Sequence, residues 1–214
     1  LPEEGKQWGS FDYSQQEPRL VAHYAASIDE NFTGAQEFIT AYQNEAADFH
    51  QIVADMAGIS RTQAKTINLG LFYGMGKAKL SKELGISKDA AENLLGKYHN
   101  RVPFVKKLAE AVMSSASKYG FIRTIKGRKC RFDMWEPATF GMNKAMQYEE
   151  AKAIYGNNIR RAFTYKALNR LIQGSAADQT KQAMIECYKQ GFKPMLQIHD
   201  ELCFSINEES DIIK

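Results

Sequence analysis

The sequence has few cysteines, no long apolar run and no strong excess of either charge. Its three cysteines, Cys130, Cys187 and Cys203, are far apart and lack the paired short spacing of a zinc or redox site, so we expect reduced thiols in a cytosol. No apolar run approaches the roughly 20 residues that a membrane span needs, and the first residues lack the basic-then-apolar pattern of a signal peptide. A net charge of +3 permits a polyanionic partner without requiring one. We therefore expect no membrane partner and a cytoplasmic location.

The length and composition set broad limits on the fold. The 214 residues, 44% apolar and 25% charged, are typical of an ordinary globular protein and suffice for one large domain or two modest ones. Because the chain begins at Leu1 rather than at Met, we expect it to be a piece of a longer protein or a processed one.

Residues 60–76 carry clear signals for both ends of a helix. Ser60 and Gln63 have the spacing of a capping box, in which each side chain bonds a backbone amide of the first turn. Gly74 and Gly76 are suited to ending the helix.

Four side chains form a stripe along this predicted helix. They recur every four residues and are Arg61, Lys65, Leu69 and Tyr73. Two cations, an aliphatic group and an aromatic ring follow the order of triphosphate, sugar and base in a deoxynucleoside triphosphate, which favours nucleotide binding. The alternative is a helix whose basic residues only face water.

Two polar residues lie at the ends of other predicted elements. A strand is expected from Trp8 to Tyr13, which leaves Asp12 at a strand end, where a turn or capping role is the simpler alternative to catalysis. A helical pattern covers residues 33–56, and His50 follows Asp48 within it. A lone histidine is more often structural than functional.

Further helices are expected at residues 77–84, 88–100 and 103–118, and a basic hairpin at residues 121–132 turns at Gly127. The five cations from Arg123 to Arg131 suit phosphate binding, although exposed basic hairpins are also common without it.

A long helical pattern covers residues 142–190, with a break at residues 156–158. Asn169 and Gln173 lie four positions apart beside small residues that allow a partner backbone to approach closely. They could contact minor-groove acceptors, or bond each other as a buried amide pair. A final hairpin, at residues 195–206, is expected to carry His199, Asp200 and Glu201 at its centre.

Four stretches, in this order along the chain, resemble motifs of the family A DNA polymerases, the relatives of bacterial DNA polymerase I. Asp12-Tyr-Ser-Gln-x-Glu-x-Arg resembles motif A, and Arg61-x-x-x-Lys followed by Tyr73-Gly resembles motif B. Residues 168–178 resemble the family segment that contacts the minor groove, and Ile198-His-Asp-Glu resembles motif C. The short spacing of His50 and Arg61 is more similar to that of phage-encoded members.

This resemblance implies an α+β, helix-rich fold, in which a polymerase palm has an antiparallel sheet with long helices and the fingers subdomain is α-helical. Residues 1–32 and 120–214 are expected to form the palm, and residues 33–119 the fingers. The thumb and the 3′–5′ exonuclease domain are expected to be absent from these residues.

The resemblance also implies template-directed DNA synthesis, in which a primer 3′-hydroxyl attacks the α-phosphate of a dNTP and pyrophosphate leaves. Two Mg²⁺ ions are expected, with Asp12, Asp200 and the backbone carbonyl of Tyr13 as ligands. Lys65 is a plausible proton donor to pyrophosphate, so the catalytic residues are expected to be Asp12, Asp200 and Lys65. Glu201 is expected to be auxiliary.

Binding residues are implied in the same way. The nucleotide is expected to contact Arg61, Lys65, His50, Leu69, Tyr73, Glu17 and Gln15. The DNA primer-template is expected to contact Asn169, Gln173, Arg170, Lys166, His199, Arg128 and Gly74. Glu17 would occupy the space of a ribose 2′-hydroxyl, which favours dNTPs over rNTPs. Leu69 departs from the family pattern of Phe or Tyr, and we expect weak acceptance of dideoxynucleotides.

Two alternatives stay open. One is a single-subunit RNA polymerase relative, which shares the two aspartates and the central helix but is disfavoured by Glu17. The other is a non-catalytic fragment that binds primer-template or nucleotide, because the chain begins without a thumb and ends soon after motif C. In that case missing polymerase segments or replisome proteins would be its partners. A role in phage DNA replication, in the cytoplasm of a bacterial host, is the expectation.

Overall fold

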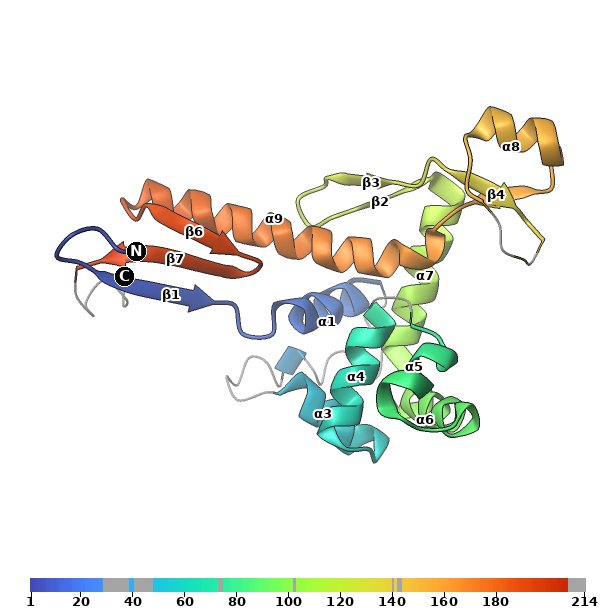
Figure 1. The fold of residues 1–214 in the computed structure, drawn as a ribbon, viewed down its shortest axis with the longest axis horizontal. Helices are drawn as coiled ribbons and strands as arrows, with labels where there is room; N and C mark the ends of the chain where they lie inside the picture. Colours follow the sequence, from blue (N-terminus) through green and yellow to red (C-terminus); the bar gives the residue numbers. More distant parts are fainter. Residues whose placement is uncertain are drawn as a thin grey trace.

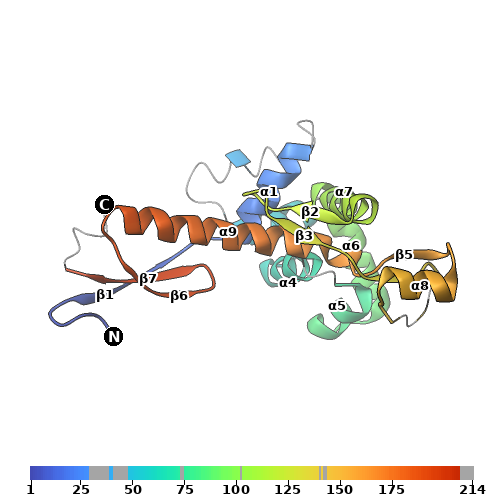
Figure 2. The ribbon, with the colours of Figure 1, turned by 90° about the horizontal axis from the view of Figure 1, so that it is seen from above.

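The computed structural model describes residues 1–28, 39–40, 48–72, 75–101, 103–139, 141 and 144–207. Over these residues the protein is elongated, and the long helix α9 (Ala167–Lys189) runs along it from a three-stranded sheet toward a small two-stranded sheet and the helix between its strands at the other end (Figures 1 and 2). Most remaining helices gather on one side of α9 (Figure 1). The expected helix-rich α+β fold is confirmed.

The sheet joins the two ends of the chain. Its strands are β1 (Gln7–Asp12), β6 (Pro194–Ile198) and β7 (Glu201–Ile206), in the antiparallel order β1-β7-β6. Asp12, the last residue of β1, pairs with Glu201, the first residue of β7. Only His199 and Asp200 separate β6 from β7, so the predicted final hairpin is confirmed. Asp12 therefore lies beside the turn that holds Asp200.

One face of the sheet supplies a small core of its own. Leu202, Phe204 and Ile206 of β7 are buried and pack against the C-terminal half of α9. Leu196 and Ile198 of β6 are each 46% exposed. The buried apolar side chains of this sheet therefore lie mainly on β7, the central strand, which has a neighbouring strand on either side.

The helices surround a larger core. Their bounds are α1 (Gln16–Ile28), α3 (Phe49–Ala57), α4 (Arg61–Phe72), α5 (Lys77–Leu84), α6 (Lys88–Arg101) and α7 (Pro103–Tyr119). The core includes Val21, Phe49, Ile67, Phe104 and Ile172, which come from five different helices. The predicted helices at 77–84, 88–100 and 103–118 are confirmed to within one residue.

The helix predicted at residues 33–56 falls largely on residues 29–38 and 41–47, which lie outside the described residues; residues 39–40 are helical, and α3 covers its end. No helix among the described residues combines the length and the apolar character needed to cross a bilayer.

The predicted capping box at the start of α4 is confirmed. The backbone amide of Ser60 donates to Gln63 Oε1 at 3.1 Å, and the amide of Gln63 donates to Ser60 Oγ at 3.2 Å. The prediction that Gly76 ends this helix was wrong: α4 ends at Phe72, and Gly76 is the extended N-cap residue of α5. Its partner in that prediction, Gly74, lies outside the described residues.

The predicted basic hairpin is confirmed as β2 (Phe121–Arg123) and β3 (Lys129–Arg131), with Gly127 at a φ of 77° in the turn. The break predicted at residues 156–158 within the helical pattern of residues 142–190 is confirmed, but the helical pattern itself was partly wrong. Before α9 the chain forms α8 (Tyr148–Tyr155), β5 (Ile159–Arg161) and a short 3-10 helix (Thr164–Lys166).

The reason for the departure is pairing with a distant segment. Strand β5 pairs antiparallel with β4 (Trp135–Pro137), which satisfies its backbone groups without a helix. The guanidinium of Arg161 also lies 4.5 Å from the centre of the Trp135 ring. Since Gly156 adopts a φ of 62° at the end of α8, the helix cannot continue smoothly into this strand.

Candidate active site

A cleft of about 580 Å³ is lined by the loop after β1, the start of α1, His50 of α3, the middle of α9 and the β6–β7 turn. It brings together predicted site residues from both ends of the chain. Those in its lining are Gln15, Glu17, His50, Gln173, His199 and Asp200. Gln16, Pro18, Ala176 and Ala177 complete it. Ala176 and Ala177 belong to the segment 168–178 that resembles the minor-groove segment of the family, whereas Gln16 and Pro18 had not been predicted as site residues.

Two residues of the cleft have unusual backbone conformations. Gln15 and His199 have φ angles of 55° and 54°, and the described part of the chain has one other non-glycine residue with positive φ, Phe163. Such conformations cost about 1 to 3 kcal/mol and are concentrated at functional sites. Gln15 is held by its side chain, whose Oε1 accepts the backbone amide of Phe49 at 2.8 Å. The loop after β1 is thereby tied to the start of α3.

Carboxylates gather where β1 meets the β6–β7 turn. Partial burial raises the pKa of Asp12, and the neighbouring carboxylates of Asp200 and Glu201 raise it further. Burial, followed by the charge of Asp200, also raises the pKa of Glu17. Asp12 faces a separate cavity of about 400 Å³, which Tyr13 also lines. The like charges of this group repel one another, so a cation would stabilise it.

The donor set fits a hard divalent cation. Asp12 and Asp200 supply carboxylate oxygens, the ligands that Mg²⁺ prefers in proteins. Within the described residues no cluster of three or more His, Cys, Asp or Glu side chains is arranged to hold a metal. An ion at this place would therefore take its other ligands from backbone carbonyls, water or a bound phosphate, as Mg²⁺ sites commonly do.

Asp48 connects α3 to α4. Its Oδ1 accepts the backbone amides of His50 at 2.9 Å and Gln51 at 3.2 Å, which caps α3. Its Oδ2 accepts from Arg61 Nε at 2.7 Å. Burial alone would raise the pKa of Asp48, but the hydrogen bond from Arg61 and those from the two amides outweigh it and lower the pKa. Arg61, predicted to bind a triphosphate, is thus paired with a carboxylate in this structure.

The structure describes only part of the stripe predicted along α4, which consists of Arg61, Lys65, Leu69 and Tyr73. Arg61 and Lys65 are both exposed, whereas Ala64 and Ile67 of the same helix are buried in the core. Leu69 belongs to the same helix. Tyr73 and Gly74 lie outside the described residues.

Four other described residues that were predicted to bind DNA are not in the lining of the cleft: Asn169, Arg170, Lys166 and Arg128. Asn169 is half-buried on α9, one turn before Gln173. Arg170 donates to the backbone carbonyl of Arg131 at 2.9 Å, and the Lys166 ammonium lies 5.6 Å from the centre of the Tyr165 ring. These cations lie near the start of α9 and close to the basic hairpin.

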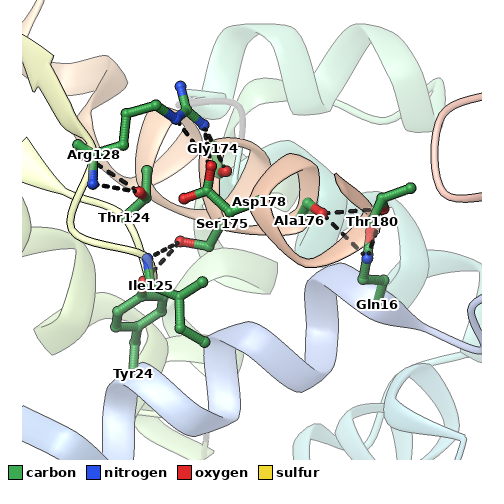
Figure 3. A network of polar contacts seen from close by, with 10 residues as sticks. All are labelled: Gln16, Tyr24, Thr124, Ile125, Arg128, Gly174, Ser175, Ala176, Asp178 and Thr180. Atoms are coloured by element: carbon green, nitrogen blue, oxygen red, sulfur yellow. Dashed lines mark hydrogen bonds and ion pairs between the residues drawn. The ribbon is translucent and has the colours of Figure 1, made fainter. Parts of the chain in front are cut away.

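Arg128 lies within a polar network that binds the hairpin to α9 (Figure 3). Its Nε donates to Asp178 Oδ1 at 2.9 Å, and its Nη2 donates to the carbonyl of Gly174 at 2.8 Å. A Cβ atom on Gly174 would lie 2.8 Å from Thr124 Cγ2, so the hairpin approaches α9 too closely for a larger residue. The small residue Gly174 of α9 therefore allows the Thr124 side chain to approach closely.

The same network reaches α1. Ser175 Oγ accepts the backbone amide of Ile125 at 3.1 Å and lies 2.7 Å from the Tyr24 hydroxyl (Figure 3). Gln16 Nε2 donates to the carbonyl of Ala176 at 3.3 Å and to Thr180 Oγ1 at 3.2 Å. These bonds could not be predicted from the sequence, because each joins residues far apart in the chain.

Comparisons with known proteins agree on one family. Residues 1–212 match the sequence profile of DNA polymerase family A. A DNA-directed DNA polymerase of Pseudomonas phage M6 is 38% identical over an alignment that covers 97% of this chain and 34% of that protein. DNA polymerase I of Caldicellulosiruptor bescii is 32% identical, over 100% of this chain and 24% of that protein.

A solved structure, the POL domain of Pol1 from M. smegmatis in complex with DNA primer-template and dNTP, superposes with a TM-score of 0.73 at 29% identity, over 100% of this chain and 36% of that one. The chain thus spans about a third or less of the length of these relatives.

Proposed function

Because the chain belongs to DNA polymerase family A, we propose that it carries the active site of a template-directed DNA polymerase, which transfers deoxynucleotides from dNTPs to a primer 3′-hydroxyl. The observation that carries the proposal is the cleft, where Glu17, His50 and Asp200 line one space beside Asp12. Phosphoryl transfer depends mainly on positioning and on charge neutralisation, which such a convergence of charged and polar groups can provide.

The two parts of the chain would have different tasks. We assign residues 1–32 and 120–214 to a palm that holds the carboxylates, and residues 33–119 to fingers that hold the nucleotide. The proximity of Asp12 to Asp200 within one sheet supports the first assignment. The packing of α3 and α4 against the core, with His50 facing the cleft, supports the second.

Asp12, Asp200 and the backbone carbonyl of Tyr13 would hold two Mg²⁺ ions. When bound, such ions supply activation of the attacking oxygen and charge neutralisation at the leaving oxygen. The raised pKa of Asp12 beside Asp200 is consistent with this use, because a site built for divalent cations concentrates negative charge that is unfavourable without them.

Exposed cations and a histidine would bind the triphosphate. Arg61 and Lys65 lie on one side of α4, and both carry charge close enough to His50 to lower its pKa. Arg61 would exchange its carboxylate partner Asp48 for a phosphate, which also accepts charge-assisted hydrogen bonds. Lys65 would donate a proton to the departing pyrophosphate.

Selectivity would come from residues at the other walls of the cleft. Glu17 would occupy the space of a ribose 2′-hydroxyl and so exclude rNTPs. Gln173, with Asn169 one turn away on α9, would donate to the minor-groove acceptors, whose positions are similar in all correct base pairs. Because this readout senses geometry, it suits a polymerase that must copy any sequence.

Replication of phage DNA in a bacterial cytoplasm would be the setting, supported by the similarity to phage polymerases. The second candidate is a part that binds primer-template or nucleotide without catalysis, since the chain spans about a third of its phage relative. Single-nucleotide extension of a labelled primer on four templates, each with one of the four dNTPs or rNTPs and Mg²⁺, separates the two. Template-matched extension by dNTPs supports the polymerase, equal use of rNTPs would indicate an RNA polymerase, and binding without extension would leave the binding role.

A further inference from the structure

A buried chain of hydrogen bonds runs from Tyr98 of α6 through Asn68 of α4 to His50 of α3. The Tyr98 hydroxyl donates to Asn68 Oδ1 at 2.6 Å, and Asn68 Nδ2 lies 3.1 Å from His50 Nδ1. Tyr98 and Asn68 are fully buried, and His50 is 9% exposed where it meets the cleft. Three helices are therefore joined by buried hydrogen bonds.

The donors and acceptors of this chain have a fixed direction. A phenol proton in a buried site needs an acceptor, and Asn68 Oδ1 accepts it, so the amide oxygen must face Tyr98. The amide nitrogen then faces His50, and an amide nitrogen only donates. His50 Nδ1 must accept this bond and carries no proton. In a neutral imidazole the proton is consequently on Nε2.

The surroundings keep the imidazole neutral. Burial lowers the pKa of His50, and the positive charges of Arg61 and Lys65 lower it further, against the opposing charge of Asp48. Glu17, His199 and Asp200 also line the cleft that His50 faces. A neutral imidazole has two tautomers, so the identity of the nitrogen that carries the proton decides whether His50 can donate into the cleft.

We propose that Tyr98 is a positioning residue that acts through Asn68 to hold the His50 proton on Nε2, ready to donate to an anionic phosphate oxygen. The functional half of this inference rests on the proposed function, because it takes the occupant of the cleft to be a nucleoside triphosphate. Tyr98 touches no reacting atom and acts only by orienting the amide that orients the ring. A flipped amide would instead favour the proton on Nδ1, leaving Nε2 as an acceptor that repels phosphate.

Nitrogen-15 NMR of the histidine-labelled chain tests the inference directly. The sequence has four histidines, and a His50→Gln variant identifies the His50 signals by their loss. In the unliganded protein at neutral pH, His50 is expected to show a protonated Nε2 and an unprotonated Nδ1. In Tyr98→Phe, which removes only the hydroxyl, both nitrogens are expected to shift toward a mixture of the two tautomers.

Two further variants distinguish positioning from a general loss of structure. Asn68→Asp keeps the shape but offers only acceptors, so the proton is expected to move to Nδ1 of His50. Tyr24→Phe also removes a hydroxyl that bonds a buried side chain, but it lies outside the chain of bonds and should leave the His50 signals unchanged. A protonated Nδ1 in the original protein, or identical His50 signals in Tyr98→Phe, would overturn the inference.

Addition of dTTP separates this inference from the proposed function. If the triphosphate binds as proposed, the Nε2 signal of His50 shifts. If Tyr98→Phe leaves half of the molecules in the tautomer without a proton on Nε2, it weakens dTTP binding about twofold. The KM for dTTP should rise by the same factor with kcat unchanged. If dTTP leaves the His50 signals unaffected while the tautomers behave as expected, the hydrogen-bond direction stands and the triphosphate role of His50 fails.

Discussion

Replacing Ser175 by alanine tests how the basic hairpin and α1 are held on α9. The Ser175 side chain is fully buried, and its hydroxyl oxygen serves two groups, the backbone amide of Ile125 and the hydroxyl of Tyr24. In Ser175→Ala, neither the Ile125 amide nor the Tyr24 hydroxyl has this oxygen as a hydrogen-bond partner. A fully buried polar group that loses its partner costs about 1 to 3 kcal/mol, and because these two hydrogen bonds are only partly buried, we expect a total loss of about 1 to 3 kcal/mol in the free energy of unfolding.

A double-mutant cycle with Tyr24→Phe assigns part of that loss to one bond. Tyr24→Phe alone should cost about 1 kcal/mol, because Ser175 keeps its bond to Ile125. The double variant should lose less free energy of unfolding than the two single variants lose together, since it leaves no tyrosine hydroxyl unpaired. The expected coupling energy between the two side chains is about 0.5 to 3 kcal/mol.

Urea unfolding followed by circular dichroism, with unchanged slopes, measures these values. Tyr119→Phe, at a side chain that is 57% exposed, is the matched control and should change little. A loss below about 0.5 kcal/mol in Ser175→Ala, or strict additivity in the cycle, would show that the Ser175 hydroxyl does not hold these segments together.

Two other substitutions test the same contact region by pH and by volume. Burial would raise the pKa of Asp178, but hydrogen bonds from Thr124 and Arg128 outweigh it and lower the pKa, so this carboxylate stabilises the fold at neutral pH and loses that effect as the pH falls below about 4. The stability gap between the original chain and Asp178→Asn, measured by urea unfolding, should therefore shrink from pH 7 toward pH 3; a constant gap argues against the ion pair. Gly174→Ala should destabilise by about 1 to 3 kcal/mol, since its Cβ would meet Thr124. Gly96→Ala, within α6 with open space around it, should instead stabilise by about 0.5 to 1 kcal/mol, and equal effects at the two glycines would contradict the packing described.

Features set by neighbouring residues could be predicted from the sequence. The capping box of Ser60 and Gln63 depends on a spacing of three residues, and the hairpin turn at Gly127 depends on a backbone conformation that glycine adopts easily. The expected juxtaposition of Asp12 and Asp200 is distant in sequence and came from motif resemblance, and the sheet register agrees with it.

Features set by distant partners could not be predicted. Residues 159–161 had a helical pattern, but pairing with β4 makes them a strand. Asn68 and Tyr98 had no distinguishing pattern, because their hydrogen bonds to each other and to His50 depend on how three helices pack. Asp178 is similar: its partner Arg128 is on the hairpin, 50 positions away. The family motifs identified the residues that line the cleft better than the buried residues whose hydrogen bonds hold the helices and the hairpin in place.

Primer extension by Asp200→Asn beside Asp89→Asn is the sharpest test of the proposed catalytic centre. Asp200 lines the cleft next to Asp12, whereas Asp89 is exposed in the first turn of α6. Both changes remove one negative charge with little change in volume. We predict that Asp200→Asn loses template-directed extension while it still binds primer-template, as followed by fluorescence anisotropy, and that Asp89→Asn retains both. Equal extension by the two variants would contradict the assignment of the carboxylate pair as the catalytic centre.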